Sequence, residues 1–334
     1  MTRQAETFVV VNYNAARARA AWAQVARVLT ESGVRFDAHE AKEAGDAQSS
    51  ARAALRAGYR TIAVVGGDGT LGEVVSGFFE LEGDGVSAAE ATTTKTPARI
   101  DADAALALLP AGTGNDFARG LAGERASLER WLARLIEHSR RDAGATTTRA
   151  VDVLRGTIGD HARPFFCLNA ATLGIGAEVA GRVAAQGRLA RRFPGEARFA
   201  LAAVQAVARW RARRISVRVD DAEAFECATN LVAVVNSAYA GGGMMFSPEA
   251  RTDDGLLDVV TASRLTRAAL VREMTRIHSG GHVKNPRVRI SRGERVRIEH
   301  LTPADALAVE ADGDVRGHTP LEFRVLAGAL KVVY

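Results

Sequence analysis

Two glycine-rich segments constrain the fold of this chain more than any other feature. Each follows a short apolar run with the composition of a buried strand, at residues 61–65 and at residues 106–109. Glycines let the backbone turn sharply and bring bare N–H groups against an anion, and the N-terminus of a following helix adds positive potential. The segments therefore predict two phosphate-binding loops at strand ends. They read Gly66-Gly67-Asp68-Gly69-Thr70 and Pro110-Ala111-Gly112-Thr113-Gly114-Asn115-Asp116-Phe117-Ala118-Arg119.

An acid in the first segment narrows the kind of phosphate that it can bind. A carboxylate repels a triphosphate unless a divalent cation lies between them. Asp68 stands in the middle of its loop, so we interpret the loop as a site for a magnesium nucleotide. A plain strand-to-turn connection is the alternative, because Gly-Asp-Gly is ordinary turn chemistry. Two such segments, each with Gly, Thr and Asp, favour the nucleotide. Neither has the ending of a P-loop or the pattern of a dinucleotide-binding turn.

The periodicity of the chain changes near its middle. The first part alternates strands with helices, which predicts an α/β domain with a parallel sheet and a ligand at the carboxyl ends of its strands. From residue 151 onward, short strands spaced by turns predict a mostly antiparallel β-sandwich, with one helical excursion at residues 177–213. We place the two domains at residues 1–140 and 141–334, with an exposed insertion at residues 81–103. The first strands are predicted at residues 8–12, 33–39, 61–65 and 105–109, and the first helices at residues 15–32, 46–58 and 71–79.

Composition is that of an ordinary globular protein. Of the 334 residues, 47% are hydrophobic and 25% are charged, which predicts a packed core. Cys167 and Cys227 lie in apolar strand-like runs, so we interpret them as buried thiols in a reducing compartment. We find no signal-peptide pattern and no run near the ~18 apolar residues that a membrane span needs. The sequence thus predicts a cytoplasmic protein.

Arginine is concentrated between Arg182 and Arg218, in a chain of formal net charge +5. One interpretation is a solvated helical face. The other is contact with an anionic surface, either a membrane leaflet or nucleic acid. Aromatic residues make up 6% of the chain and are not interleaved with the arginines, as base stacking would require. A peripheral contact with membrane is therefore favoured over nucleic acid.

The motifs, taken in order, resemble those of the diacylglycerol kinase catalytic family, in particular its bacterial soluble lipid kinases, which are related to sphingosine kinases. The first glycine segment alone would also fit NAD kinases and phosphofructokinases, whereas the ordered series is more specific and runs over nearly the whole chain. Besides the two glycine segments, the series comprises residues 169–179, 236–244, 247–250, 253–258, 312–314 and 319–323.

The resemblance implies that the first domain binds ATP with Mg²⁺. Asp68 then acts through the Mg²⁺, and Asn115, Asp116 and Arg119 line the cleft between the domains. Arg119 is the cation expected to neutralise phosphate charge, with a helix-surface arginine as the alternative. The nucleotide-binding residues implied are Asn12, Gly66, Gly67, Asp68, Gly69, Thr70, Glu73, Thr113, Asn115, Asp116 and Arg119.

The resemblance also implies a catalytic base for the acceptor hydroxyl. The family's Asp-Gly-Glu loop reads Asp312-Gly313-Asp314 here, so Asp314 is one methylene shorter than the usual Glu. A misplacement of roughly 1 Å can cost on the order of 10²-fold in rate. Either the backbone compensates or Asp312 acts as the base instead. An acidic β-turn without a catalytic role is the alternative.

The loop Asp253-Asp254-Gly255 resembles the family's second, structural Mg²⁺ site. The ligands implied are the side chain of Asp254 and the main-chain carbonyls of Arg251 and Leu256. Oxygen ligands at a turn suit a hard cation, and a simple Asp-Asp-Gly turn is the alternative.

By this resemblance the chain is an ATP-dependent lipid kinase that phosphorylates a hydroxyl of diacylglycerol or a similar lipid at the membrane surface, as part of phospholipid biosynthesis. Apolar residues such as Phe166, Leu173 and Ile175 suggest an apolar acceptor site, although they would equally suit the sandwich core. The expected partners are a lipid substrate and an anionic membrane surface, with no nucleic acid, and a homodimer stays open. Two alternatives remain: a kinase of a soluble substrate, as NAD kinase is, and a nucleotide-binding sensor without catalysis.

Overall fold

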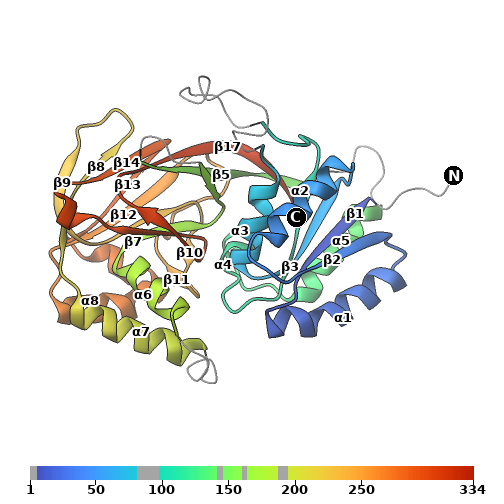
Figure 1. Cartoon of the computed structure of the whole chain (residues 1–334), viewed down its shortest axis with the longest axis horizontal. Coiled ribbons are helices and arrows are strands. Elements are labelled where there is room, and N and C mark those ends of the chain that lie inside the picture. The colour runs from blue at the N-terminus through green and yellow to red at the C-terminus, as the bar shows by residue number, and fades with distance from the viewer. Residues whose placement is uncertain (1–5, 81–97, 141–145, 160–163, 187–194) are drawn as a thin grey trace. The chain divides into compact units, whose positions relative to one another are not determined.

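The computed structural model describes residues 6–80, 98–140, 146–159, 164–186 and 195–334. It divides into two compact units (Figure 1): unit 1 comprises Met1–Val153 with Leu326–Tyr334, and unit 2 comprises Leu154–Val325. The predicted fold class is confirmed, because unit 1 is α/β with parallel strands and unit 2 is mostly antiparallel β-structure. The return of the last residues to unit 1 was not part of the prediction.

A parallel sheet in the order β2-β1-β3-β4 forms the centre of unit 1. Strand β3 is buried along its whole length, as its continuous apolar sequence requires when helices cover both faces. The end of β17 joins this sheet, with Lys331 and Val332 pairing in parallel with β4. These strands are β1 (Thr7–Asn12), β2 (Phe36–Ala41), β3 (Thr61–Gly66), β4 (Ala105–Pro110) and β17 (Leu321–Val333).

The helices of unit 1 lie on both faces of the sheet. The chain moves one way from β1 to β2 and then back past β1 to β3, so right-handed crossovers place α1 and α2 on opposite faces. Gln24 of α1 donates to Glu129 of α5 at 3.2 Å, whereas Gly77 of α3 packs against α2. The reversal makes the ends of β1 and β3 a topological switch point, where ligands of such sheets bind. The helices are α1 (Ala16–Glu31), α2 (Asp46–Arg56), α3 (Asp68–Gly77), α4 (Asp116–Ala122) and α5 (Leu128–Arg140).

Unit 2 is built on the antiparallel order β16-β15-β7-β9-β8-β14-β17. The long strand β9 pairs with β8 through its first half and with both β7 and β12 through its second half, so the sheet divides into two layers around a buried core. The strands are β5 (Thr148–Ile158), β6 (Phe165–Cys167), β7 (Ala170–Gly174), β8 (Arg213–Val219), β9 (Phe225–Val235), β10 (Tyr239–Ala240), β11 (Met244–Met245), β12 (Leu257–Ser263), β13 (Val288–Gly293), β14 (Arg295–His300), β15 (Ala308–Ala311) and β16 (Asp314–His318).

Helices α6 (Ile175–Ala184), α7 (Gly195–Arg209) and α8 (Arg267–Arg276) share one hydrophobic cluster with Ala262 of β12. The helical stretch predicted for residues 177–213 is wrong at its end, because β8 begins at Arg213. Its middle, residues 187–194, lies outside the described residues, and so do residues 81–97 of the predicted insertion. Within the described part of the chain, no helix is both long and apolar enough to span a bilayer.

Candidate functional site

The two glycine loops of unit 1 lie against each other, backbone to backbone. A Cβ atom on Gly112 would lie 2.4 Å from the Cα of Gly67, and a Cβ on Gly67 would lie 3.1 Å from the Cα of Gly112. No side chain fits at the tighter of these contacts. The glycines are therefore needed for the loops to meet, in addition to any role in approaching a ligand.

Asp68 joins the two loops. It is the first residue of α3, and its carboxylate accepts hydrogen bonds from the main-chain N–H groups of Asp116 and Phe117, both at 3.1 Å. These are the first two residues of α4, where the main-chain N–H groups have no acceptor within the helix and the helix dipole stabilises a negative charge. Each carboxylate oxygen accepts one of these bonds and keeps a further lone pair. Asp68 thus both orders the loops and keeps acceptor capacity.

Asn115 closes the second loop on itself. Its backbone is left-handed, with φ of 54°, a conformation that Asn tolerates better than most residues. Its Oδ1 accepts a hydrogen bond from the main-chain N–H of Gly112 at 2.8 Å. The sequence order Gly-Thr-Gly-Asn-Asp is therefore a turn followed by a helix start.

Asn12 bridges the switch point. Its Nδ2 donates to Thr70 Oγ1 at 2.7 Å, which connects the end of β1 to the segment that follows β3. Its Oδ1 accepts from the main-chain N–H of Ala15 at 3.2 Å. Asn12 therefore holds the first glycine loop in place from the neighbouring strand.

Residues of both loops line a small pocket of about 20 Å³. That is enough for a water molecule and far too little for a nucleotide. Gly69 and Thr113 are the exposed residues of the two loops. The pocket is lined by Val64, Gly66, Gly67, Asp68, Leu71, Leu108, Leu109, Pro110, Asn115 and Ala118.

Two other predicted nucleotide residues lie on the flanking helices. Glu73 of α3 accepts a hydrogen bond from the main-chain N–H of Gly45, at 3.2 Å, just before α2 begins. Arg119 is half-buried on α4. The structure therefore gives Glu73 a contact that orders the neighbouring loop, and places Arg119 on the helix that Asp68 caps.

In unit 2, Asp312 and Gly313 form the two-residue turn between β15 and β16. Both have positive φ, 49° and 98°, as expected for the type I′ turn that Asp-Gly favours in hairpins. Asp314 is the first residue of β16 and is exposed, with its Oδ2 3.2 Å from Nη2 of Arg316. The turn therefore presents the carboxylate of Asp314 to solvent.

Asp312 has a different environment from Asp314. It is 8% exposed, and its carboxylate accepts hydrogen bonds from the main-chain N–H groups of Leu168, Asn169 and Ala170 at 2.7, 3.1 and 3.1 Å. Burial raises the pKa of the Cys167 thiol well above its usual value, so the thiol stays protonated and also donates to Asp312, at 3.3 Å. Asp312 therefore anchors the turn to the segment between β6 and β7.

Comparison with known proteins places both units in known families. Residues 6–147 match the diacylglycerol kinase catalytic domain, and residues 170–334 match the YegS C-terminal NAD kinase beta sandwich-like domain. A probable lipid kinase YegS-like from Pseudomonas aeruginosa is 32% identical over 293 residues, which cover 87% of this chain and 82% of that protein.

The chain belongs to the YegS-like lipid kinase family. A further relative, from Chromohalobacter salexigens, is 29% identical and is covered over 75% of its length by 81% of this chain. The fold of this YegS-like chain is similar to the crystal structure of a diacylglycerol kinase from Bacillus anthracis, with a TM-score of 0.66, 19% identity, and coverage of 100% of this chain and 98% of the other.

In this YegS-like chain, the side chain of Arg292 lies against the loop that the resemblance assigns to a second Mg²⁺. Asp254 Oδ1 accepts from the main-chain N–H of Leu256 at 3.2 Å, and its Oδ2 lies 3.6 Å from Nη2 of Arg292. The same arginine pairs with Asp258 at 2.7 Å. Among the described residues no three His, Cys, Asp or Glu side chains gather as metal ligands, so an ion would rest on Asp254 and carbonyls such as that of Arg251. Since Arg292 already supplies positive charge to Asp254, these residues fit an ion poorly, and we derive no step from one.

Sequence reasoning missed Glu310, which lies on β15 next to the turn. It is 9% exposed, and it accepts hydrogen bonds from Thr172 Oγ1 at 2.6 Å and from the main-chain N–H of Gly313. Burial raises its pKa to about 7. The available signal was an acid between Val309 and Ala311, in a strand otherwise suited to the core.

The apolar residues considered for the acceptor site are mostly core. Phe166 and Leu173 are fully buried, and Ile175 belongs to the cluster beneath the helices. They therefore carry no information about the acceptor.

Proposed function

We propose that this chain is an ATP-dependent lipid kinase that transfers the γ-phosphate to a hydroxyl of diacylglycerol or a similar lipid at a membrane surface. The observation that carries the proposal is the pair of glycine loops fastened by Asp68 at the switch point of a parallel sheet. Phosphoryl transfer demands mainly positioning and neutralisation of charge, which such loops provide. Membership of the YegS-like family supports a lipid acceptor.

On the nucleotide side, the exposed backbone around Gly69 and Thr113 supplies N–H donors to phosphate. Asp68 keeps one orientation because α4 holds both of its oxygens. A bound Mg²⁺ would offset the negative charge of the phosphates and of this carboxylate. Arg119, on the same helix α4, adds a cation near these loops.

On the acceptor side, Asp314 takes the proton of the hydroxyl. An exposed carboxylate can reach a substrate, whereas the carboxylate of Asp312 is buried and already accepts three main-chain hydrogen bonds. Of the two candidate bases, accessibility thus favours Asp314. A positioned base contributes typically 10²–10⁴-fold to the rate.

The test compares acceptors in one assay with γ-labelled ATP: diacylglycerol in mixed detergent micelles, NAD, and no acceptor. We expect lipid-dependent incorporation of label by the wild type and a loss of at least about 10²-fold in Asp68→Asn. Label in NAD but not in lipid would support a soluble acceptor, in line with the NAD kinase-like description of the second domain. Nucleotide binding without transfer to either would make the chain a sensor, and both outcomes contradict the proposal.

A further inference from the structure

Helix α7 has apolar residues on both of its faces. Its inner face is buried in the cluster shared with α6 and α8, through Ala202, Ala203, Ala206 and Val207. A surface helix normally shows polar residues on the opposite face. On α7, however, Leu201 is 55% exposed and Val204 is 66% exposed. The other outward residues that the structure describes before the final Arg209 are Ala197, Ala200, Gln205 and Ala208.

Helix α8 continues this apolar surface. Its residue Val271 is 52% exposed, and Leu270 beside it packs into the cluster that also buries α7. Figure 1 shows α7 and α8 next to each other along one side of unit 2. Six large hydrophobic side chains are exposed in the described part of the chain, and three of them, Leu201, Val204 and Val271, lie on these two neighbouring helices.

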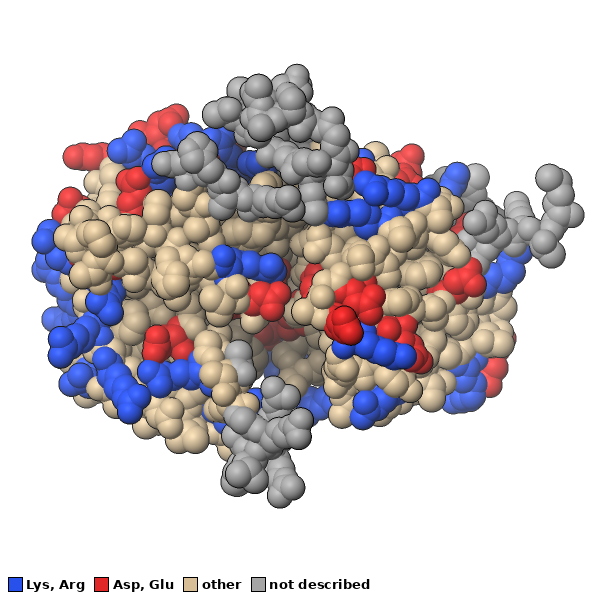
Figure 2. Space-filling model, in the orientation of Figure 1, with Lys and Arg blue, Asp and Glu red and all other residues tan. Residues whose placement is uncertain are grey.

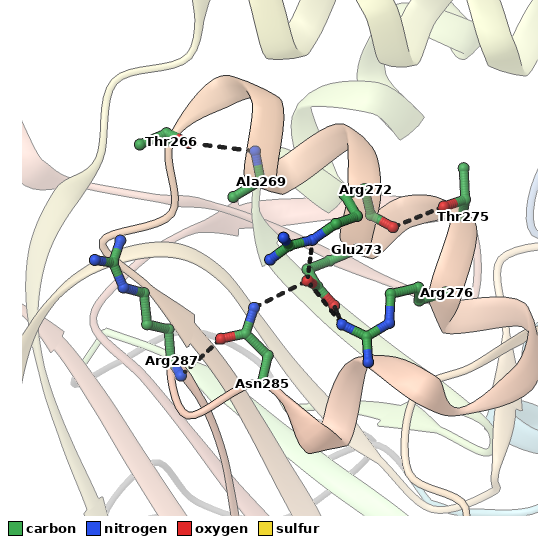
Figure 3. A network of polar contacts seen from close by, with 8 residues as sticks. All are labelled: Thr266, Ala269, Arg272, Glu273, Thr275, Arg276, Asn285 and Arg287. Carbon is green, nitrogen blue, oxygen red and sulfur yellow. Dashed lines mark hydrogen bonds and ion pairs between the residues drawn. The ribbon is translucent and has the colours of Figure 1, made fainter.

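Among the described side chains of α7 and α8, the charges that are exposed are positive. The carboxylate of Glu273 on α8 is buried and pairs with Arg272 at 3.1 Å and with Arg276 at 3.3 Å, while Asn285 donates to it at 2.9 Å. Figure 3 shows this carboxylate enclosed by the three side chains. It is the only carboxylate among the described side chains of α7 and α8, since Glu196 of α7 lies outside them.

Exposed arginines flank the apolar residues. Arg209 ends α7, Arg211 follows it, and Arg267 and Arg272 lie on α8. In Figure 2, Lys and Arg side chains gather over the part of unit 2 where Figure 1 places these helices. Apolar tips surrounded by cations match the interface of an anionic bilayer, where apolar side chains enter the boundary and arginines meet the headgroups.

We infer that the outward face of α7 and α8 docks on an anionic membrane surface, with Leu201, Val204 and Val271 entering the interface. A second copy of the chain fits this face less well, since a symmetric contact would bring the same arginines together. The inference rests on the proposed function only in expecting a lipid acceptor, and it gives the enzyme a means of reaching one.

The test measures co-sedimentation of the full chain with phosphatidylcholine vesicles that contain or lack phosphatidylglycerol. We expect binding to the anionic vesicles, and about tenfold or more weaker binding after the double change Leu201→Ser and Val204→Ser. Arg209→Glu with Arg267→Glu should weaken binding by at least about fivefold for each arginine, in a salt-dependent way. The matched controls are Ile290→Ser and Arg218→Glu, which change exposed residues on β13 and β8. Thermal unfolding checks that every variant is folded.

A second readout separates this inference from the proposed function. Phosphorylation of a monomeric short-chain diacylglycerol should be unchanged in the α7 variant, while phosphorylation of vesicle-borne diacylglycerol falls. Equal vesicle binding by the wild type and the folded α7 variant overturns the inference, and so does a change from dimer to monomer with vesicle binding intact. If the wild type binds vesicles through this face but phosphorylates neither lipid, the docking face stands and the proposed function fails.

Discussion

At Gly112, the lack of a side chain is a packing requirement. The loops of β3 and β4 touch through Gly67 and Gly112, and a Cβ on Gly112 would fall within 2.4 Å of backbone. Backbone cannot move aside as a flexible side chain can. The two loops can therefore separate only if the arrangement fastened by Asp68 is lost.

Gly112→Ala should destabilise the protein by about 1–3 kcal/mol, as overpacking does, and should lower kinase activity because the loops are displaced. Gly181→Ala on α6 is the control: a Cβ there meets nothing within 4 Å, and the helix should gain up to about 1 kcal/mol. Urea unfolding of both variants gives the comparison. Equal stability of the two variants would show that the loops are not in contact.

Glu310 is buried, so folding opposes the ionisation of its side chain. Burial raises its pKa from the usual 4.5 to about 7. Below pH 4.5 the group is protonated in both the folded and the unfolded chain. Between pH 4.5 and about pH 7 the side chain is ionised in the unfolded chain but still protonated in the folded chain. Stability therefore falls as the pH rises towards 7, and it stays lower at higher pH.

Glu310→Gln should remove this pH dependence, because the amide resembles the protonated acid and cannot ionise. The variant should gain on the order of 3 kcal/mol relative to the wild type between pH 4.5 and pH 8. Thermal or urea unfolding across this range measures the difference. A constant difference at every pH would mean that Glu310 titrates normally.

In the hairpin of β15 and β16, the two acids of the turn have different environments. Asp312 faces inward and gathers the main-chain N–H groups of Leu168, Asn169 and Ala170, while Asp314 faces solvent. A continuous strand would place residues two apart on the same face, whereas the turn at Asp312 and Gly313, both with positive φ, separates the directions of the two acids.

Asp312→Asn should therefore cost stability and Asp314→Asn should not. The first change turns an amide group toward N–H donors and leaves buried donors unpaired, at a cost on the order of 3 kcal/mol. The second removes only an exposed ion pair with Arg316, worth no more than about 0.5 kcal/mol. Urea unfolding measures both, and a stable Asp312→Asn would contradict the anchoring role.

Strands β3 and β4 were predictable because their signals are local. Continuous apolar runs that lead into a glycine-rich segment mark buried parallel strands, and these predictions agree with β3 and β4. The bonds of Asp68 to α4 were not predictable, since they join residues 48 and 49 positions apart. Glu310 was missed for the same reason: its environment depends on Thr172, which lies far away in the chain.

At the scale of the molecule, the chain leaves unit 1 and comes back to it. Its last strand, β17, pairs with β14 of unit 2 and then with β4 of unit 1. Within unit 1, Gly328 donates to Asp152 at 2.7 Å, which fixes the returning segment. A linear division at residue 140 could not show this return, because a strand pattern does not reveal its partner.

Transfer of label from γ-labelled ATP to diacylglycerol, by the wild type and by Asp314→Asn, tests whether this chain is a lipid kinase with Asp314 as its base. We predict a labelled phospholipid from the wild type and at least about 10²-fold less from the equally stable variant. Undiminished transfer by Asp314→Asn would refute the base assigned here. A wild type that labels no lipid would contradict the proposed function.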